Sequence, residues 1–220
     1  MRILVTAGNT QSPIDKVRCI TNIFTGRTGT QIALAAYHHG HTVTLLTSHP
    51  ELVRELSPGP MEHLRWHAKP YRTFDDLAVL LEAHVSGGGF DAVVHSAAVS
   101  DFRVEGVYDR DRREIVEGKI KSGHEELWLK LTPTPKLVDR FRRDWGFQGV
   151  LVKFKLEVGL TDEQLIKVAE QSRLQSQANW MVANLFESRH QYAYLGNGEG
   201  SYKEVARRDL AEYLLRAMQE

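Results

Sequence analysis

Short apolar stretches alternate with amphipathic ones along most of the chain, and this alternation constrains the fold more than any other feature of the sequence. Residues 2–6 predict a buried strand, residues 30–37 a helix rich in small apolar side chains, and residues 41–48 a strand with several β-branched residues. Gly40 is expected to end the helix in the left-handed conformation that glycine tolerates. The N-terminal part of the chain therefore predicts one strand–helix–strand unit.

The same rhythm continues toward the C-terminus. We expect strands at 64–68, 91–95, 149–157 and 180–185, an antiparallel edge strand at 191–195, a helix starting near Phe74, a helix over 134–141 with Pro135 at its first position, a helix opened by a capping box from Thr161 to Gln164, and a closing helix over 203–218. Residues 104–131 are charged and lack helical periodicity, which predicts a projecting flap or β-hairpin. The expected fold class is α/β: a Rossmann-like, doubly wound, mainly parallel sheet in a single domain over residues 1–220. Ligands in such sheets bind beyond the carboxyl ends of the strands.

Composition narrows the possible functions. The 28 Lys and Arg residues balance 28 Asp and Glu residues, so affinity for anions must come from a local site and not from bulk charge. Cys19, the single cysteine, excludes an internal disulfide and fits a reducing compartment. No apolar run approaches the roughly 18 residues of a membrane span. We therefore expect a soluble, cytoplasmic protein.

The long polar connection over residues 6–29 is the first candidate site. A tight turn would suffice between strand and helix, whereas this segment is rich in Gly, Thr, Asn and Asp, and loops of this length are usually functional or disordered. It ends at Gly26 and Gly29, where backbone N–H groups at a helix N-terminus form a natural anion site. The alternative for both glycines is an ordinary helix start with close packing.

Two common nucleotide-binding signatures are absent. The G-x-G-x-x-G fingerprint does not follow the first strand, and Thr47 and Ser48 stand where an acidic residue would hold a ribose. The P-loop motif is also missing. These absences disfavour a nicotinamide-dependent oxidoreductase and a standard NTPase. His38, His39 and His41 have no Cys or carboxylate ligand beside them, so no metal ligand is predicted.

Several separated motifs, taken in order, resemble phosphopantothenoylcysteine synthetase (phosphopantothenate–cysteine ligase) of the coenzyme A pathway. They are ILVTAGNTQSPID, RCITNIFTGRTG, HSAAVSDF, GKIKS, LTPTPKLV, VKFKLEVGL and MVAN, and they cover essentially the whole chain. The Lys-Phe-Lys-Leu and Lys-Ile-Lys-Ser variants are most similar to the stand-alone monofunctional bacterial form. Nothing corresponds to the fused flavin-dependent decarboxylase, so no flavin is expected.

The resemblance implies a two-step ligase reaction. The carboxylate of 4′-phosphopantothenate attacks the α-phosphate of CTP, or of ATP as in eukaryotic relatives, and pyrophosphate leaves. The amine of cysteine then displaces the nucleotide from the acyl-nucleotidylate to form the amide. The resemblance also implies Mg²⁺ accompanying the nucleotide, and a homodimer in which the flap or the first loop completes the partner's site, with neither nucleic acid nor membrane as a partner. Such catalysis rests mostly on positioning and on electrostatic stabilisation of phosphoryl oxygens.

Residue roles follow from the same resemblance. The catalytic residues would be Asn22, which handles the acyl intermediate, and Lys119 in the flap. The nucleotide would be bound by Gly8, Gly26, Gly29, Lys119, Phe154 and Asn184, and phosphopantothenate by Arg18 (reaching a neighbouring subunit's substrate), Asn22, Ala97, Ala98 and Asp101. Plainer alternatives remain open: a turn former for Asn22, a surface charge for Arg18, a solvated hairpin face for Lys119, a core aromatic for Phe154 and an Asx turn for Asp101.

Two positions depart from the family pattern. The family has a hydroxyl two residues after the asparagine, where this chain has Phe24; either a backbone N–H or Thr25 makes that contact, or activity is impaired. Ser122 replaces the third basic residue of the flap's Lys-x-Lys-Lys motif. These departures motivate one alternative function, a catalytically impaired nucleotide-binding relative. The expected fold motivates another, an NAD(P)-dependent oxidoreductase.

Overall fold

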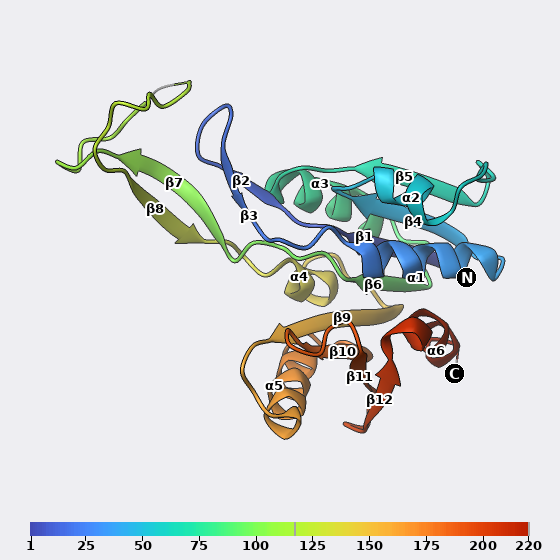
Figure 1. Cartoon of the computed structure of the whole chain (residues 1–220). Helices are drawn as coiled ribbons and strands as arrows, with labels where there is room; N and C mark the ends of the chain where they lie inside the picture. Colours follow the sequence, from blue (N-terminus) through green and yellow to red (C-terminus); the bar gives the residue numbers. More distant parts are fainter. Residues whose placement is uncertain (117, 220) are drawn as a thin grey trace.

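Eight strands of the described chain form one central sheet (Figure 1). The computed structural model describes residues 1–116 and 118–219. Across the sheet the strands lie in the order β12 (Tyr202–Ala206), β11 (Tyr192–Gly196), β10 (Trp180–Leu185), β9 (Val150–Glu157), β6 (Ala92–His95), β1 (Arg2–Ala7), β4 (Thr42–Thr47) and β5 (Trp66–Pro70). The strands from β5 to β10 pair in parallel, whereas β11 and β12 are antiparallel additions. The predicted mainly parallel sheet is confirmed.

β1 lies at the point where the winding of the sheet reverses. It pairs in parallel with β4 on one side and with β6 on the other. The chain runs outward from β1 through β4 to β5, and then crosses to β6 and continues outward through β9 to β10. The carboxyl ends of β1 and β6 therefore flank the crevice where ligands bind in sheets of this kind.

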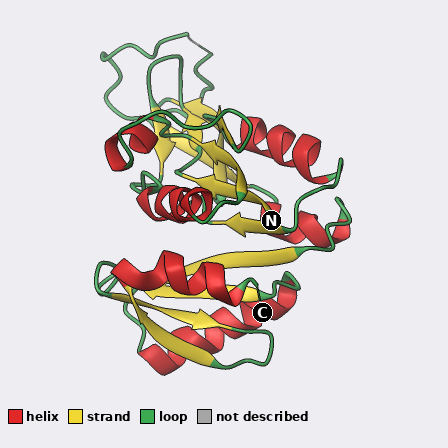
Figure 2. Cartoon of the chain, turned by 90° about the vertical axis from the view of Figure 1, so that its right-hand side faces the viewer, coloured by secondary structure: helices red, strands yellow, loops and turns green. Residues whose placement is uncertain are grey.

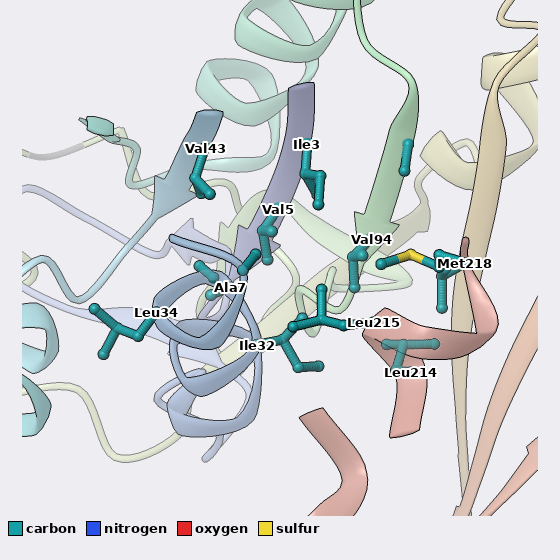
Figure 3. Close-up of a cluster of buried hydrophobic side chains, with 14 of the residues drawn as sticks. Ile3, Val5, Ala7, Ile32, Leu34, Val43, Val94, Leu214, Leu215 and Met218 are labelled. Atoms are coloured by element: carbon teal, nitrogen blue, oxygen red, sulfur yellow. The ribbon is translucent and has the colours of Figure 1, made fainter. Parts of the chain in front are cut away.

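Helices cover both faces of the sheet (Figure 2). On one face α1 (Arg27–His38), α2 (Glu51–Leu56) and α6 (Leu210–Ala217) bury a core that includes Ile3, Val5 and Ile32 (Figure 3). On the other face α3 (Phe74–Val85) and α4 (Leu137–Arg143) pack over Leu4, because successive strand residues point to opposite faces. There α5 (Asp162–Gln175) also packs, over Met181 of β10. The double winding is thus complete.

Two antiparallel hairpins project from the sheet (Figure 1). β7 (Phe102–Tyr108) pairs with β8 (Trp128–Pro133) and forms the expected flap; residue 117, inside it, lies outside the described residues. β2 (Gln11–Pro13) pairs with β3 (Cys19–Thr21) inside the first loop. This second hairpin was not predicted, because three-residue strands are too short to show an alternating pattern.

The C-terminal prediction is wrong in two respects. Residues 203–206 belong to β12, which pairs with β11, so 191–195 is not an edge strand and 203–218 is not one helix. A 3₁₀ turn, η1 (Arg207–Asp209), separates β12 from α6. Within β12 only Val205 is buried, so the strand lacks the clear alternation that would distinguish it from the start of an amphipathic helix.

The helix expected over 134–141 begins instead at Leu137, and Pro135 precedes it. Thr134 is held at the base of the flap: its N–H donates to the carbonyl oxygen of Asp101 (2.9 Å) and its hydroxyl to that of Ser100 (2.6 Å). These two bonds keep the backbone extended where the sequence alone suggests a helical turn.

Two local signals are confirmed. Gly40 has a φ of +84° after α1, and Thr161 and Gln164 form a reciprocal capping box at the start of α5. The short helix α2 was not predicted. None of the described helices is both long enough and apolar enough to cross a membrane.

Candidate functional site

The first loop and the loop after β6 meet where the winding reverses. The N–H of Ala98 donates to the carbonyl oxygen of Gly8 (2.7 Å), and the side-chain amide of Asn22 donates to the carbonyl oxygen of Ala98 (2.9 Å). Asn9 secures this arrangement by donating its side-chain amide to the carbonyl oxygen of Asn22 (2.7 Å). Gly8, Asn22, Ala97 and Ala98, all predicted site residues, are therefore neighbours at the carboxyl edge of the sheet. We call these four residues the edge cluster.

Gly26 and Gly29 bring the first turn of α1 against this cluster. Gly26, the N-cap, has a φ of +86°, and a Cβ on it would lie 2.0 Å from the backbone nitrogen of Gly8. A Cβ on Gly29 would lie 2.2 Å from the Oγ of Ser96. Close packing is thus a sufficient reason for glycine at both positions. The same close approach places the first N–H groups of α1, which have no partner within the helix, at the carboxyl edge of the sheet. The nucleotide-binding role of the two glycines stays a prediction.

A separate set of contacts joins the two projecting hairpins. The N–H of Lys16 donates to the carbonyl oxygen of Gly118 (3.0 Å), the N–H of Ile120 donates to Oδ2 of Asp15 (3.1 Å), and the guanidinium of Arg18 donates to the carbonyl oxygen of Ile120. We call these contacts the latch. They place the flap segment that carries the predicted catalytic lysine directly against the turn that carries the predicted phosphate-binding arginine.

Asp15 is the centre of the latch. Its side chain is fully buried, and its oxygens accept the N–H groups of Val17 and Arg18 (both 2.8 Å) as well as that of Ile120. The bond from Val17, supported by those from Ile120 and Arg18, lowers the pKa of Asp15. Because Lys119 directly precedes Ile120, Asp15 positions the backbone of Lys119, whose own side chain is exposed. Arg18 keeps 46% of its side chain exposed.

Asp15→Asn is expected to loosen the latch. The amide keeps the shape but has no charge and only one acceptor oxygen, so it loses the ion pair with Arg18 (3.0 Å) and at least one of the three N–H bonds that the carboxylate accepts. One to two lost hydrogen bonds correspond to roughly 5- to 30-fold faster opening of the segment 118–120. Hydrogen exchange of the amides in that segment measures this. Asp111→Asn, in the same flap but paired only with Arg113 at 3.7 Å, is the matched control; equal exchange in both variants would contradict the role of Asp15.

Three further predicted residues have protein partners. Asp101 forms an ion pair with Lys136, which is exposed and contributes little to holding either side chain. Phe154 packs against the core beneath α1 and α6, which favours the core alternative for its side chain. Asn184 is buried, and its Oδ1 accepts a hydrogen bond from Arg207 (2.7 Å). The nucleotide and substrate roles of these residues stay predictions.

Phe24 has a structural partner at the position where a hydroxyl was expected. Its ring meets that of Phe186 edge to face, with 6.5 Å between centroids, and the guanidinium of Arg189 lies 3.8 Å from the centroid of Phe186. Phe24 therefore joins the first loop to the β10–β11 connection.

Two ionisable residues, His95 and Lys153, lie opposite each other on the paired strands β6 and β9, next to the edge cluster. His95, at the end of β6, is buried beside the hydroxyl of Thr6 (3.0 Å), and burial, with a smaller effect of Lys153, lowers the pKa of His95 to about 4. Burial also lowers the pKa of Lys153 to about 8, and its Nζ donates to the carbonyl oxygen of Ser172 (2.9 Å). His95 is therefore neutral at pH 7, and its ring packs edge to face against that of Phe141.

Sequence reasoning missed two residues of this region. Asp15 stands in a quoted motif, so the motif itself was the available signal, although no role was attached to the residue. Arg207 was placed in a predicted helix, and nothing in its immediate sequence marks it. No group of three or more His, Cys, Asp or Glu residues gathers to hold a metal within residues 1–116 and 118–219.

A family model and a curated relative each match most of this chain. The family model described as DNA/pantothenate metabolism flavoprotein C-terminal domain matches residues 1–197. The coenzyme A biosynthesis bifunctional protein CoaBC of Thermococcus kodakarensis is 36% identical over 188 residues, which cover 85% of this chain and 42% of that protein. The chain thus spans less than half the length of this curated relative.

Solved structures show the same fold. The DNA/pantothenate metabolism flavoprotein of Streptococcus pneumoniae aligns with a TM-score of 0.85 and 28% identity, covering 100% of this chain and 98% of that one. A mutant of Cab2 in complex with phosphopantothenate-cysteine aligns with a TM-score of 0.77, covering 99% of this chain and 86% of that one; at 20% identity this likeness concerns the fold alone.

Proposed function

We propose, from the premise that this chain belongs to the DNA/pantothenate metabolism flavoprotein C-terminal domain family, that it is a phosphopantothenate–cysteine ligase of coenzyme A biosynthesis. It joins the carboxylate of 4′-phosphopantothenate to the amine of cysteine, with CTP favoured over ATP as the activating nucleotide. The observation that carries the proposal is the family match over residues 1–197, which includes the whole edge cluster and both partners of the latch.

The geometry suits a reaction between two anionic substrates. The triphosphate approaches the first turn of α1, where the helix N-terminus favours negative charge. In the first step a carboxylate oxygen of phosphopantothenate forms a bond to the α-phosphorus, and the bond from that phosphorus to pyrophosphate breaks. Lys119 and Arg18 supply positive charge from the joined hairpins. Donors and cations therefore dominate over acid–base pairs, as expected for phosphoryl chemistry.

In the second step the cysteine amine attacks the acyl carbon and the nucleoside monophosphate leaves. Asn22 lies beside the reacting acyl group in this proposal, with its amide already directed by the carbonyl oxygen of Ala98. A donor fixed before the reaction stabilises developing oxyanion charge without reorganisation.

Mg²⁺ would enter with the nucleotide. It is usually bound by one or two carboxylates together with substrate phosphates. Bound there, it would neutralise phosphate charge.

A homodimer is part of the proposal. The flap leaves Phe102, Trp128 and Leu131 exposed by 51%, 40% and 45%, so apolar surface is available on the element that would reach a neighbouring subunit.

Amide formation tests the proposed function. Incubation with phosphopantothenate, cysteine, Mg²⁺ and either CTP or ATP should give the amide product by mass spectrometry, with a higher rate for CTP. Absence of product with both nucleotides would contradict the ligase.

A second candidate function is that of a nucleotide-binding relative that has lost catalysis, and the position of Phe24 against Phe186 favours it. Nucleotide binding without amide product would select it. Family membership leaves the oxidoreductase alternative without an observation in its favour.

A further inference from the structure

Arg207 connects three separate elements at the carboxyl edge of the sheet. It opens η1, after β12, and its backbone N–H donates to the carbonyl oxygen of Gln191 (2.8 Å). Its guanidinium donates through Nη1 to Oδ1 of Asn184 at the end of β10 (2.7 Å), and through Nη2 to Oγ1 of Thr28 in the first turn of α1. One side chain thus ties the end of β10 to the start of the helix that borders the edge cluster.

The described neighbours of this guanidinium do not neutralise its charge. Among residues 1–116 and 118–219, no carboxylate lies within 4.0 Å of it; its side-chain acceptors are an amide and a hydroxyl. Its partial burial lowers the pKa of Arg207, but an arginine in a protein remains charged. It also stands beside the positive end of the α1 dipole. Two positive features face one region, which favours an anion there.

Arg207 also sets the orientation of Asn184. Among the described residues, the acceptors of the side-chain amide nitrogen of Asn184 are distant: the carbonyl oxygens of Lys155 (3.3 Å) and Val182 (3.4 Å). The bond from the Arg207 guanidinium to Oδ1 of Asn184 is shorter, at 2.7 Å. Without the guanidinium the amide would keep two weak bonds and be free to turn.

Arg142 shows what a purely structural arginine looks like in this fold. It is partly buried, and burial lowers its pKa as well. Its acceptors are the carbonyl oxygens of Gln177 and Phe147 and the side chain of Asn179, which precede β9 and β10. These contacts lie at the amino edge of the sheet, away from the ligand crevice.

We propose that Arg207 is a positioning residue of the nucleotide site: it holds Asn184 and the first turn of α1 in the arrangement that receives the triphosphate, and its charge adds to the attraction for that polyanion. This inference rests on the proposed function for the identity of the anion. Arg207 acts through Thr28 and Asn184.

Arg207→Gln is the test. The variant loses the charge and one of the two bridging bonds, so the KM for the nucleotide should rise about 10- to 100-fold, as expected for the loss of a charge together with one charge-assisted hydrogen bond. The KM for phosphopantothenate and the kcat at saturating nucleotide should stay within about threefold. Arg207→Lys keeps the charge but not the fork, and should give an intermediate nucleotide KM.

Two controls separate positioning from a structural role. Arg208→Gln, at the exposed neighbouring position, should leave both KM values unchanged. Arg142→Gln should lower the thermal midpoint without a selective change in the nucleotide KM. If Arg207→Gln changes both KM values equally, or lowers kcat alone, the inference is overturned.

Two other causes of a negative result can be distinguished: a variant that does not fold, and a wild-type chain that is not a ligase. Should Arg207→Gln lose its near-ultraviolet circular dichroism, Arg207→Lys carries the test, and an unchanged nucleotide KM there overturns the inference. If the wild-type chain makes no amide, the proposed function fails on its own. Calorimetric titration of CTP and ATP into the wild type and the two Arg207 variants then still decides the inference, since equal affinities would overturn it.

Discussion

Asn22→Ala is expected to lower the rate of amide formation by about 10²- to 10³-fold, the usual effect of removing one preorganised donor from a charge-stabilising site. The side chain donates to the carbonyl oxygen of Ala98 and belongs to the edge cluster at the carboxyl ends of β1 and β6. Alanine leaves that position without a donor. Because Asn22 is only partly buried, the fold should lose no more than about 1 kcal/mol.

Ile23→Ala is the matched control for this prediction. Ile23 is the next residue of the same loop, and its side chain is 75% exposed, so its truncation should change neither rate nor stability. Steady-state product formation and urea unfolding of both variants measure the two effects. Turnover like that of the wild type in Asn22→Ala would remove Asn22 from the mechanism.

Gly26→Ala is expected to lower the free energy of unfolding by about 2–5 kcal/mol, from the strain of a left-handed alanine together with overpacking. The new Cβ would lie 2.0 Å from the nitrogen of Gly8 and 2.6 Å from its Cα. These are backbone atoms, so no side-chain rotation relieves the overlap, and α1 has to move away from β1. The shift should also separate the first turn of α1 from the edge cluster and weaken nucleotide binding.

Gly40→Ala separates the two contributions to that loss. Gly40 has nearly the same φ, +84° against +86°, but a Cβ there would meet nothing within 4 Å. It should lose only the conformational part, roughly 1–2 kcal/mol. Urea unfolding of both variants gives the comparison, and equal losses would mean that the contact with Gly8 does not matter.

The sequence predicted the parallel part of the fold well, because its strands are short apolar runs with a glycine close to one end, as at residues 2–6 and 91–95. The local composition of such a run is enough to predict that it forms a strand. β12 was taken for helix because only Val205 in it is buried, and the β2–β3 hairpin was missed because its strands have three residues each. Their pairing depends on partners distant in the chain, which periodicity does not report.

One part of the candidate site could likewise be predicted from the sequence and another part could not. Gly8, Asn22, Ala97 and Ala98 follow strands whose carboxyl ends share one edge, so fold topology alone places them near each other. The latch joins residues about a hundred positions apart, and on the flap side each of its bonds is made by a backbone group of Gly118 or Ile120. Backbone groups carry no sequence signature.

Pyrophosphate release in the absence of cysteine tests the central claim most directly. If the chain activates phosphopantothenate as an acyl-nucleotidylate, pyrophosphate should appear when both phosphopantothenate and CTP, or both phosphopantothenate and ATP, are present, and neither substrate alone should give it. Release in these mixtures, before cysteine is added, is the predicted result. No pyrophosphate with either nucleotide, or release that does not depend on phosphopantothenate, would contradict it.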